Sequence, residues 1–376
     1  MSWPLVAIGD VAEILSGNAW KSSQFTNESE GRLPIIRIQN ISDVATDFIY
    51  WDGVALEKYI IKDGDLLLSL SGNVKLCEWS FGNALLNQRI VKLAPTACVD
   101  KRYFYWALHR VVAKIEAMAR HAVIANVSVT DLKEFQIPLP PLPEQKRIAA
   151  ILDKADAIRR KRQQAIQLAD DFLRAVFLDM FGDPVTNPKG WPLKRFGEIG
   201  TWSSGGTPSR TVSDFFEGEI NWYSAGELNS RYLDGSVEKI SESAIKNSAA
   251  KIFKKDSLLV GMYDTAAMKI SILKEDSSCN QACANVECNE LANVEWLYSY
   301  IDYAKDSYLS RRRGVRQKNL NLGMIRDFLL PLPPRDLQDE FVRFVSAVFG
   351  IKKKQQEGND FPVFESLSLK AFSGQL

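Results

Sequence analysis

The sequence predicts a mixed α/β (α+β) protein with two tandem-duplicated globular domains, separated by long helices that pair as an antiparallel coiled coil. Three observations predict this fold. The second half repeats the first, each repeat contains short apolar runs between turn residues, and each repeat ends in a proline run that precedes a long helix. The 376 residues, 46% of them hydrophobic and 25% charged, are ordinary for a globular chain of two or three domains.

The duplication appears as a nearly constant spacing between matching segments. Trp3-Pro4-Leu5 recurs 188 residues later as Trp191-Pro192-Leu193, and Asn87-Gln88 recurs 193 residues later as Asn280-Gln281. The small change in spacing indicates a loop of different length in the two copies. A repeat of this size is a domain rather than one unit of a solenoid.

The strands and short helices of each repeat follow from the local pattern. Segments 33–41, 63–72 and 89–95 are apolar runs bounded by Gly, Asp, Asn or Pro, which is typical of β-strands. Helices are expected to follow at 100–119 and, in the second repeat, at 293–310. Each repeat is therefore expected to fold as a compact α/β globule.

A proline run closes the first globule, because the four prolines within 138–143 cannot continue a strand ladder or lie inside a helix. A long helix is expected at 144–181, since Pro143 suits a first helical turn and Gly182 a helix end. Its 38 residues correspond to about 57 Å. Apolar residues at alternating three- and four-residue steps are expected to form its contact seam: Ile148, Ile151, Ala155, Ile158, Ala165, Ala169, Phe172 and Val176.

The second repeat ends in the same way. Pro-Leu-Pro-Pro at 331–334 precedes an apolar stripe at 336–356, which Gly358 and Pro362 interrupt before a short helix at 364–372. A long helix with a narrow apolar seam needs a partner in water, so the two helices are expected to pair with each other. The expected domains are 1–143 and 183–335, with a central helix at 144–182 and a broken distal helix at 336–376.

Absent motifs argue against catalysis in this chain. No Walker A pattern occurs, and the five cysteines follow no zinc spacing. A nuclease could use Asp131 and Glu144 to hold Mg²⁺, but the second repeat has Leu337 in place of Glu144, which is better explained as a first-turn helix residue. We predict no catalytic and no metal-binding residues. The lack of a leader segment, and of any run of about 18 apolar residues, predicts a soluble, cytoplasmic protein.

Local charge is more informative than the net charge of +1. A cationic cluster, which favours binding to phosphates, places five cations within eight residues: Arg311, Arg312, Arg313, Arg316 and Lys318. Two further clusters, at 159–162 and 352–354, lie in the expected helices. They fit a solvated helix face, a phosphate contact or a partner protein.

Two dissimilar globules, each closed by Pro-Leu-Pro-Pro and followed by a long helix, resemble the specificity subunits of type I restriction-modification enzymes (the HsdS family). The resemblance covers essentially the whole chain. Its most specific segments are IPLPPLPEQKRIAAILDKADAIRRKR at 137–162, LPLPPRDLQ at 330–338 and FESLSLKAFSGQL at 364–376. The break at Gly358 and Pro362 departs from the family pattern and predicts a shorter coiled coil.

The resemblance implies a DNA-recognition subunit without catalytic activity of its own. Each globule would be a target recognition domain that reads one half of a bipartite, asymmetric site in double-stranded DNA. The helices would set the spacer and dock the modification subunits, of which two are expected. This chain would hold no cofactor: AdoMet for adenine-N6 methylation, ATP and Mg²⁺ would belong to the modification and restriction subunits.

Specificity is expected in strand-end loops where the two repeats differ. Candidate DNA-binding residues are Arg37, Gln39, Asn40, Asn73 and Lys75 in the first repeat, and Tyr223, Ser224, Glu227 and Lys269 in the second, together with the cationic cluster. Asn87, Gln88, Asn280 and Gln281 are also candidates. Because they recur in both repeats, they are either structural or base-reading.

The sequence leaves two alternatives open. One is the specificity subunit of a related bipartite system whose methylase and nuclease are fused. The other is a coiled-coil scaffold that binds no DNA, against which the cations at 311–318 argue.

Overall fold

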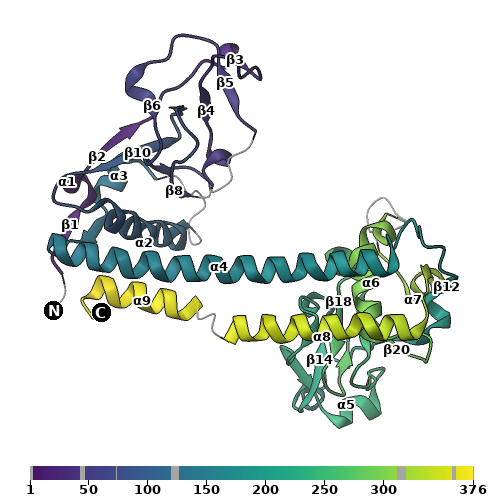
Figure 1. Cartoon of the computed structure of the whole chain (residues 1–376). Coiled ribbons are helices and arrows are strands. Elements are labelled where there is room, and N and C mark those ends of the chain that lie inside the picture. The colour runs from purple at the N-terminus through teal and green to yellow at the C-terminus, as the bar shows by residue number, and fades with distance from the viewer. Residues whose placement is uncertain are drawn as a thin grey trace. The chain divides into compact units, whose positions relative to one another are not determined.

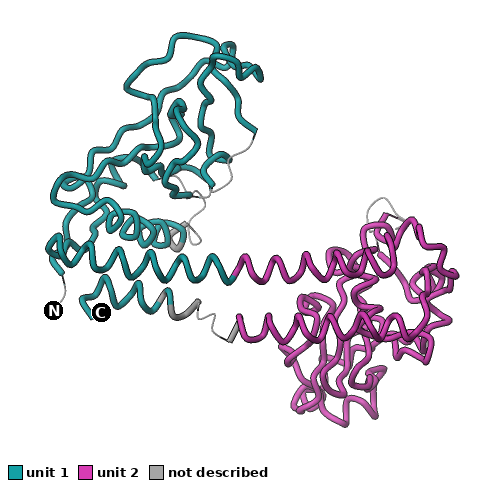
Figure 2. Tube along the Cα trace, viewed as in Figure 1, with its two compact units in different colours: residues 1–162, 359–376 teal, residues 163–358 magenta. Residues whose placement is uncertain are grey.

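The computed structural model describes residues 3–42, 47–72, 74–119, 127–310, 319–357 and 361–375. The chain forms two compact units: unit 1 is Met1–Arg162 with Asn359–Leu376, and unit 2 is Gln163–Gly358 (Figure 2). The C-terminal segment therefore belongs to the same unit as the N-terminal globule. Within the described ranges, no helix combines the length and the apolar content needed to cross a membrane.

Unit 1 contains two main sheets and one strand pair. The four-stranded sheet is antiparallel, in the order β2-β10-β7-β8 (Ala12–Ser16, Ile90–Pro95, Leu66–Ser69, Leu76–Glu78). The five-stranded sheet has the order β3-β5-β4-β9-β6 (Phe25–Thr26, Ile49–Trp51, Pro34–Ile36, Ala84–Leu86, Ile60–Ile61). In it, β4 and β9 are parallel. Strand β1 (Leu5–Ala7) pairs antiparallel with β11 (Gln136–Pro138).

The helices of unit 1 confirm the expected helix at 100–119, which is α2 (Lys101–Ala119). The other short helical elements are α1 (Ile8–Val11), α3 (Val129–Glu134), η1 (Ser22–Gln24), η2 (Ile38–Asn40) and η3 (Glu57–Tyr59). The prediction of a strand at 33–41 is wrong beyond Ile36, because the chain there forms the 3₁₀ turn η2. There the Asn40 side-chain oxygen accepts a hydrogen bond from the Arg37 amide at 3.0 Å, which favours a turn over a strand.

Unit 2 has the same plan. Its five-stranded sheet has the order β13-β20-β17-β18-β15 (Gly200–Ser204, Cys283–Cys288, Leu258–Gly261, Ile270–Leu273, Tyr232–Leu233). Its three-stranded sheet has the order β16-β14-β19 (Glu238–Ile240, Ile220–Tyr223, Ser278–Cys279), and β12 (Leu193–Arg195) pairs with β21 (Leu329–Pro331). The helical elements are α5 (Glu242–Asn247), α6 (Val294–Leu309), α7 (Leu322–Asp327), η4 (Phe196–Glu198), η5 (Ser213–Phe216), η6 (Ala225–Glu227) and η7 (Asp264–Ala266).

The topology confirms the duplication. The strand order β2-β10-β7-β8 of unit 1 is repeated as β13-β20-β17-β18 in unit 2. The parallel pair β4–β9 is repeated as β14–β19, and the closing pair β1–β11 as β12–β21. The helix expected at 293–310 is α6, in the position of α2. Cys279 of β19 and Cys283 of β20 are buried in strands, at the positions that Leu86 and Ile90 hold in the first repeat.

The long helices confirm the expected proline-to-helix transitions (Figure 1). Helix α4 spans Leu142–Phe181, with Pro143 in its first turn, and Gly182 follows it at φ +79°. Helix α8 spans Arg335–Glu357 and α9 spans Phe361–Ser373, so the distal helix is broken where Gly358 and Pro362 predicted. Gly374 follows α9 at φ +72°, as Gly182 follows α4.

The helices pair antiparallel within each unit. In unit 2, the Lys352 ammonium lies 2.7 Å from the Asp170 carboxylate, and the rings of Phe341 and Phe177 are 5.4 Å apart. In unit 1, α9 packs on α2 and the first part of α4. There the Arg159 guanidinium lies 6.0 Å from the Phe364 ring centroid, and Phe372 shares an apolar cluster with Leu152.

The seam predicted for α4 is wrong in part. Ile158 is 45% exposed, whereas Phe172, although 49% exposed, does contact α8, with its ring centroid 6.5 Å from that of Phe344. The prediction assumed one partner helix along the whole length, whereas the two ends of α4 pack on the globules of different units. The buried residues therefore follow the globule-facing side: Gln145, Ile148, Ala149, Leu152 and Asp156 near its start, and Leu173, Phe177 and Phe181 near its end.

A buried glutamine explains why Pro-Leu-Pro-Pro recurs before each long helix. In unit 1, Gln145 donates to the carbonyls of Pro140 and Cys98 at 2.8 and 3.1 Å and accepts from the Asp100 amide at 2.7 Å. It thereby joins the proline run, the start of α2 and α4. We call this arrangement the glutamine lock.

Unit 2 repeats the glutamine lock at the same place. Gln338 donates to the carbonyls of Pro333 and Leu291 at 2.9 and 3.0 Å and accepts from the Asn293 amide at 2.8 Å. It thereby joins the second proline run, the start of α6 and α8. Both glutamine side chains are buried, so these bonds are shielded from water.

Candidate nucleic-acid interface

The candidate residues of unit 1 lie in three loops that meet at one edge. Strands β4 and β9 are parallel neighbours, so the loops that follow them leave the sheet on the same side. The β7–β8 loop reaches the same place, because the Leu70 amide donates to the carbonyl of Arg89 at 3.0 Å. We call the described residues of 37–42, 70–75 and 87–89 loop edge 1.

Unit 2 brings together the equivalent loops. Strands β14 and β19 are parallel neighbours, and the Asn280 amide donates to the carbonyl of Tyr223 at 2.9 Å. The β17–β18 loop joins them through the Met262 amide, which donates to the carbonyl of Ala282 at 2.9 Å. We call residues 224–229, 262–269 and 280–282 loop edge 2.

A close backbone approach fixes both loop edges. A Cβ placed on Gly17 would lie 2.2 Å from the Asn87 carbonyl oxygen, and one on Gly205 would lie 2.3 Å from that of Asn280. The Gly17 amide donates to Ile90 at 3.1 Å, and the Gly205 amide donates to Cys283 at 3.0 Å. Only glycine leaves room for this contact, so the same frame holds the turn before β10 and the turn before β20.

The recurring asparagines hold these turns. The Asn87 side-chain oxygen accepts from the Arg89 amide at 3.3 Å, and that of Asn280 accepts from the Ala282 amide at 3.0 Å. The glutamines that follow are exposed. Gln281 also accepts a hydrogen bond from the Thr207 hydroxyl. The asparagines thus have a structural role in both units, and the exposed amides of Gln88 and Gln281 are presented at the tips of the turns.

The first loop of each edge is a capped 3₁₀ turn. Asn40 is buried and caps η2, while Gln39 is exposed. The half-buried Arg37 donates to the carbonyl of Asp47. In this loop Gln39 is exposed, whereas the Nε of the Arg37 guanidinium is buried.

Glu227 occupies the place of Asn40 in unit 2. Its carboxylate accepts from the Ser224 amide and hydroxyl, at 2.8 and 2.6 Å, and from the Val237 amide at 2.8 Å. Tyr223 is buried, its hydroxyl accepts from the Gly235 amide at 3.1 Å, and burial raises its pKa. These contacts give Glu227 and Tyr223 a structural role in shaping loop edge 2.

The lysines of the hairpin loops differ in their contacts. The Lys269 ammonium donates to the Asn229 side chain at 2.7 Å within loop edge 2. For the Lys75 ammonium, no hydrogen bond or ion pair is formed with the described residues. Asn73 and the cationic cluster, Arg311, Arg312, Arg313, Arg316 and Lys318, lie outside the described residues. The next described residue is Asn319. Its side-chain oxygen accepts a hydrogen bond from the Asp264 amide of loop edge 2 at 3.1 Å.

Two exposed residues of these loops were missed from the sequence. Arg89 follows Gln88 at the surface of loop edge 1, and its counterpart in unit 2 is Ala282. Tyr263 is 37% exposed in loop edge 2, and its counterpart is Leu70. Both positions differ between the repeats, so the criterion that selected the other candidates would have found them had it been applied to every loop position.

The two carboxylates that a nuclease could have used to hold Mg²⁺ make local structural contacts instead. None of the described residues form a cluster of three or more His, Cys, Asp or Glu side chains suited to a metal ion. The Asp131 side chain caps α3 by accepting from the Ser128 amide at 2.9 Å, and Glu144 pairs with Arg147 at 2.8 Å. These contacts lower the pKa of both carboxyls. Each has a local structural role.

Comparison with known proteins finds relatives among the specificity subunits of type I restriction enzymes. The family model "Type I restriction modification DNA specificity domain" matches residues 2–168 and 188–358, one match per repeat. The EcoBI specificity subunit of a type I restriction enzyme from Escherichia coli is 27% identical over 429 residues, covering 100% of this chain and 86% of the relative. The EcoR124I/EcoR124II specificity subunit from Escherichia coli is 25% identical over an alignment that covers 70% of this chain and 68% of that subunit.

Solved structures show the same fold. The S subunit of a type I restriction-modification system from M. genitalium aligns with a TM-score of 0.62 at 16% identity, covering 98% of this chain and 96% of that one. A chain solved to explain complex assembly and conformational transition of a type I R-M system aligns with a TM-score of 0.52 at 17% identity, covering 100% and 98%.

Proposed function

The chain belongs to the family of type I restriction-modification DNA specificity proteins, and from this premise we propose that it is the non-catalytic subunit that selects the DNA site of such a complex. Each unit would read one half of a bipartite, asymmetric site in double-stranded DNA. The observation that carries the proposal is the pair of loop edges, in which one backbone frame presents different side chains in the two units. Two different readers on a shared scaffold suit a site with two different halves.

The chemistry of the loop edges supports base and phosphate contacts. Exposed amides, as on Gln39 and Gln88, can pair with base edges in a major groove, and Gln is a common partner of adenine. Cations such as Lys75 and Arg89 can hold phosphates, and those of the cationic cluster precede Asn319 at loop edge 2. The structural residues of the edges, such as Asn87 and Glu227, would act by fixing the loops.

The exposed apolar side chains of the long helices support a docking role. Leu168 on α4 and Ile351 on α8 are 67% and 55% exposed, in addition to Phe172. Large apolar side chains in water favour a protein partner. We propose that two modification subunits bind these helices, that restriction subunits join the complex, and that the length of α4 contributes to the spacer of the DNA site.

Catalysis would belong entirely to the partners. Modification subunits would carry AdoMet and methylate adenine N6, and restriction subunits would use ATP and Mg²⁺. A protein that reads DNA must share a compartment with it. In Escherichia coli, the source of two of the relatives, that compartment is the cytoplasm, and we propose the same location for this chain.

The test uses the complex reconstituted with its modification subunits, whose methylated sites are mapped by sequencing. Replacing Gln39, Lys75 and Arg89 with alanine alters loop edge 1 without touching its frame, and is expected to relax one half of the methylated site. The matched variant, Thr265→Ala with Lys269→Ala, is expected to relax the other half. An unchanged site in both variants, or a complex that binds no DNA, would contradict the proposal.

A further inference from the structure

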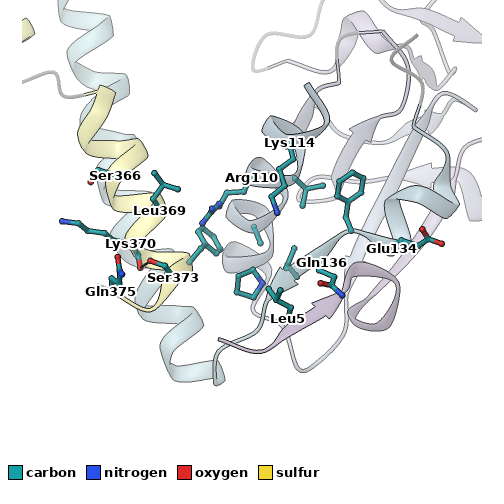
Figure 3. Close-up of a pocket in the computed structure, with 16 residues that line it drawn as sticks. Leu5, Arg110, Lys114, Glu134, Gln136, Ser366, Leu369, Lys370, Ser373 and Gln375 are labelled. Atoms are coloured by element: carbon teal, nitrogen blue, oxygen red, sulfur yellow. Dashed lines mark hydrogen bonds between the residues drawn. The ribbon is translucent and has the colours of Figure 1, made fainter. Parts of the chain in front are cut away.

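Unit 1 contains a cavity of about 770 Å³ that the DNA-reading role does not use. It lies between α2, the strand pair β1–β11 and α9 (Figure 3). Its apolar wall includes Val111, Ile137 and Phe372, and Leu5 of β1 lies at its edge. The cavity is separate from loop edge 1, whose residues do not line it.

Unit 2 has a smaller counterpart of about 300 Å³, built from equivalent positions. Leu193, Tyr300, Ala304, Ser307 and Pro331 stand there in place of Leu5, Ala107, Val111, Lys114 and Pro138. A segment of the chain itself, 184–187, completes the wall, and the Tyr300 hydroxyl donates to the carbonyl of Pro184 at 3.3 Å. The chain thus shows which kind of peptide suits this site.

That peptide is a compact, proline-containing turn with an acidic first residue. The Asn187 amide donates to the carbonyl of Asp183 at 2.9 Å, and the Asp183 carboxylate accepts from the amides of Val185 and Thr186, each at 2.8 Å. These bonds close the turn directly after α4. A short peptide of this sequence therefore carries its own turn-forming contacts.

The cavity of unit 1 is also more cationic than its counterpart. Arg110 extends from α2 toward α9, Lys114 on the next turn of α2 also lines the cavity, and Lys370 points away (Figure 3). Neither Arg110 nor Lys114 forms an ion pair with a described residue, and the Arg110 guanidinium lies 5.1 Å from the Phe372 ring centroid. Their counterparts in unit 2, Tyr303 and Ser307, are uncharged.

Desolvation gives Arg110 a preference for an anionic occupant. Burial lowers the pKa of Arg110, because its charge is partly removed from water without a carboxylate to offset the cost. A carboxylate placed between Arg110 and Lys114 would offset it. Glu134, the one carboxylate among the described lining residues, extends away from them (Figure 3).

We propose that this cavity binds an acidic, proline-containing turn of a partner protein, in the position that 184–187 takes in unit 2. Apolar residues of the turn would contact Ala107 and Val111, and its carboxylate would lie between Arg110 and Lys114. The proposal concerns assembly and stands whether or not the loop edges read DNA.

The probe is a fluorescently labelled peptide with the sequence of residues 181–191, FGDPVTNPKGW, titrated with the full chain and followed by anisotropy. Ala107→Tyr introduces the unit 2 residue, whose hydroxyl donates to the Pro184 carbonyl there, so it is expected to strengthen binding. Ala249→Tyr, on the surface of unit 2, is the matched control and is expected to leave binding unchanged. Absent binding, or equal binding to Ala107→Tyr and the control, would overturn the proposal.

A charge cycle tests the proposed ion pair separately from the apolar contacts. Lys114→Gln and a peptide with Asp183→Asn are each expected to weaken binding about fivefold, and to weaken it little further when combined, because both remove the same ion pair. Lys246→Gln, on an exposed helix of unit 2, is the control. Independent, fully additive effects would exclude this ion pair. If Ala107→Tyr fails to fold, the charge cycle alone tests whether the peptide binds in this cavity.

The last arm identifies the source of the natural turn, and it rests on the proposed function because it uses the assembled complex. If a subunit of the complex supplies the turn, the peptide binds the free chain but not the complex. Equal binding to both would overturn the assignment to a partner. DNA binding of the same complex is measured separately, so a failure of DNA recognition is distinguishable from a failure of this proposal.

Discussion

Loop edge 1 and loop edge 2 share their frame and differ in their exposed side chains. Both are fixed by a glycine pressed against an asparagine carbonyl, Gly17 on Asn87 and Gly205 on Asn280. At the tips, Arg89 of loop edge 1 faces water where loop edge 2 has Ala282. Buried backbone contacts therefore fix the shape of each loop edge, whereas the side chains that differ are exposed and free to change.

A shared frame with different side chains is also found where each globule joins its long helix. In unit 1, Arg102 is 40% exposed and pairs with Glu78 at 2.8 Å and with Asp153 of α4. In unit 2, Arg231 is 9% exposed, pairs with Glu295 at 2.8 Å and lies 5.2 Å from the Phe349 ring centroid of α8. One junction is a solvated ion-pair network and the other is desolvated, although an aromatic ring lies against the guanidinium in both and the glutamine lock is repeated beside each.

The largest expected effect tests what the units share. Gln145→Ala and Gln338→Ala each leave one buried amide and two carbonyls without partners, so each is expected to lower the free energy of unfolding by about 4 kcal/mol. Urea unfolding followed by circular dichroism measures the loss, with the exposed Gln163→Ala as control. A large effect in only one unit would show that the two locks are not equivalent.

The next largest effect should differ between the two units, because the arginine at each junction differs in exposure. Arg231→Ala removes the cationic partner of the poorly exposed Glu295 carboxylate and leaves it, among the described residues, only the Tyr232 hydroxyl, so it is expected to cost about 3 kcal/mol. Arg102→Ala should cost about 1 kcal/mol, because its pairs are solvated. Added salt should reduce the loss for Arg102→Ala but not for Arg231→Ala. Unfolding of both variants at two salt concentrations checks this, and an equal response to salt would contradict it.

The cationic cluster has no counterpart of equal density in the first repeat. Replacing Arg311, Arg312 and Arg313 with alanine is expected to weaken DNA binding of the assembled complex roughly tenfold and to reduce its salt slope by about 2.7, if each contacts one phosphate. Binding is measured at two or more salt concentrations. An unchanged slope would place these residues on a solvated surface.

The smallest effect concerns acid. Burial lowers the pKa of His109 in unit 1 to about 4, and its counterpart in unit 2 is Asp302. As pH falls below about 6.5, the unfolded chain gains a proton that the folded chain does not bind until about pH 4, so stability is lost across that window. The loss at pH 5.5 should be about 1 kcal/mol. His109→Gln should remove this part of the change between pH 7.5 and 5.5, and an identical acid response in the variant would exclude it.

Much of this architecture could be predicted because it depends on residues with strong local rules. Prolines at 138–143 and 331–334 placed the starts of α4 and α8, and Gly182, Gly358 and Pro362 placed their ends. The shared Asn-Gln pairs revealed the duplication that strand order then confirmed.

The rest depends on contacts that a linear pattern does not contain. The strand at 33–41 ends early because of one side-chain cap from Asn40, and the seam of α4 was misjudged because two globules, rather than one helix, decide which side is buried. Among the candidate site residues, Asn40 and Glu227 cap turns, since a polar loop residue has the same sequence signature whether it caps a backbone or faces a ligand.

The glutamine lock has a consequence for the timescale on which the chain opens. The amides of Asp100 and Asn293 precede α2 and α6, where backbone hydrogens ordinarily exchange with water quickly. Here each is held by the buried side-chain oxygen of Gln145 or Gln338. Their hydrogens exchange with deuterium only when a long helix releases its globule, so two single amides report separately on the anchoring of α4 and α8.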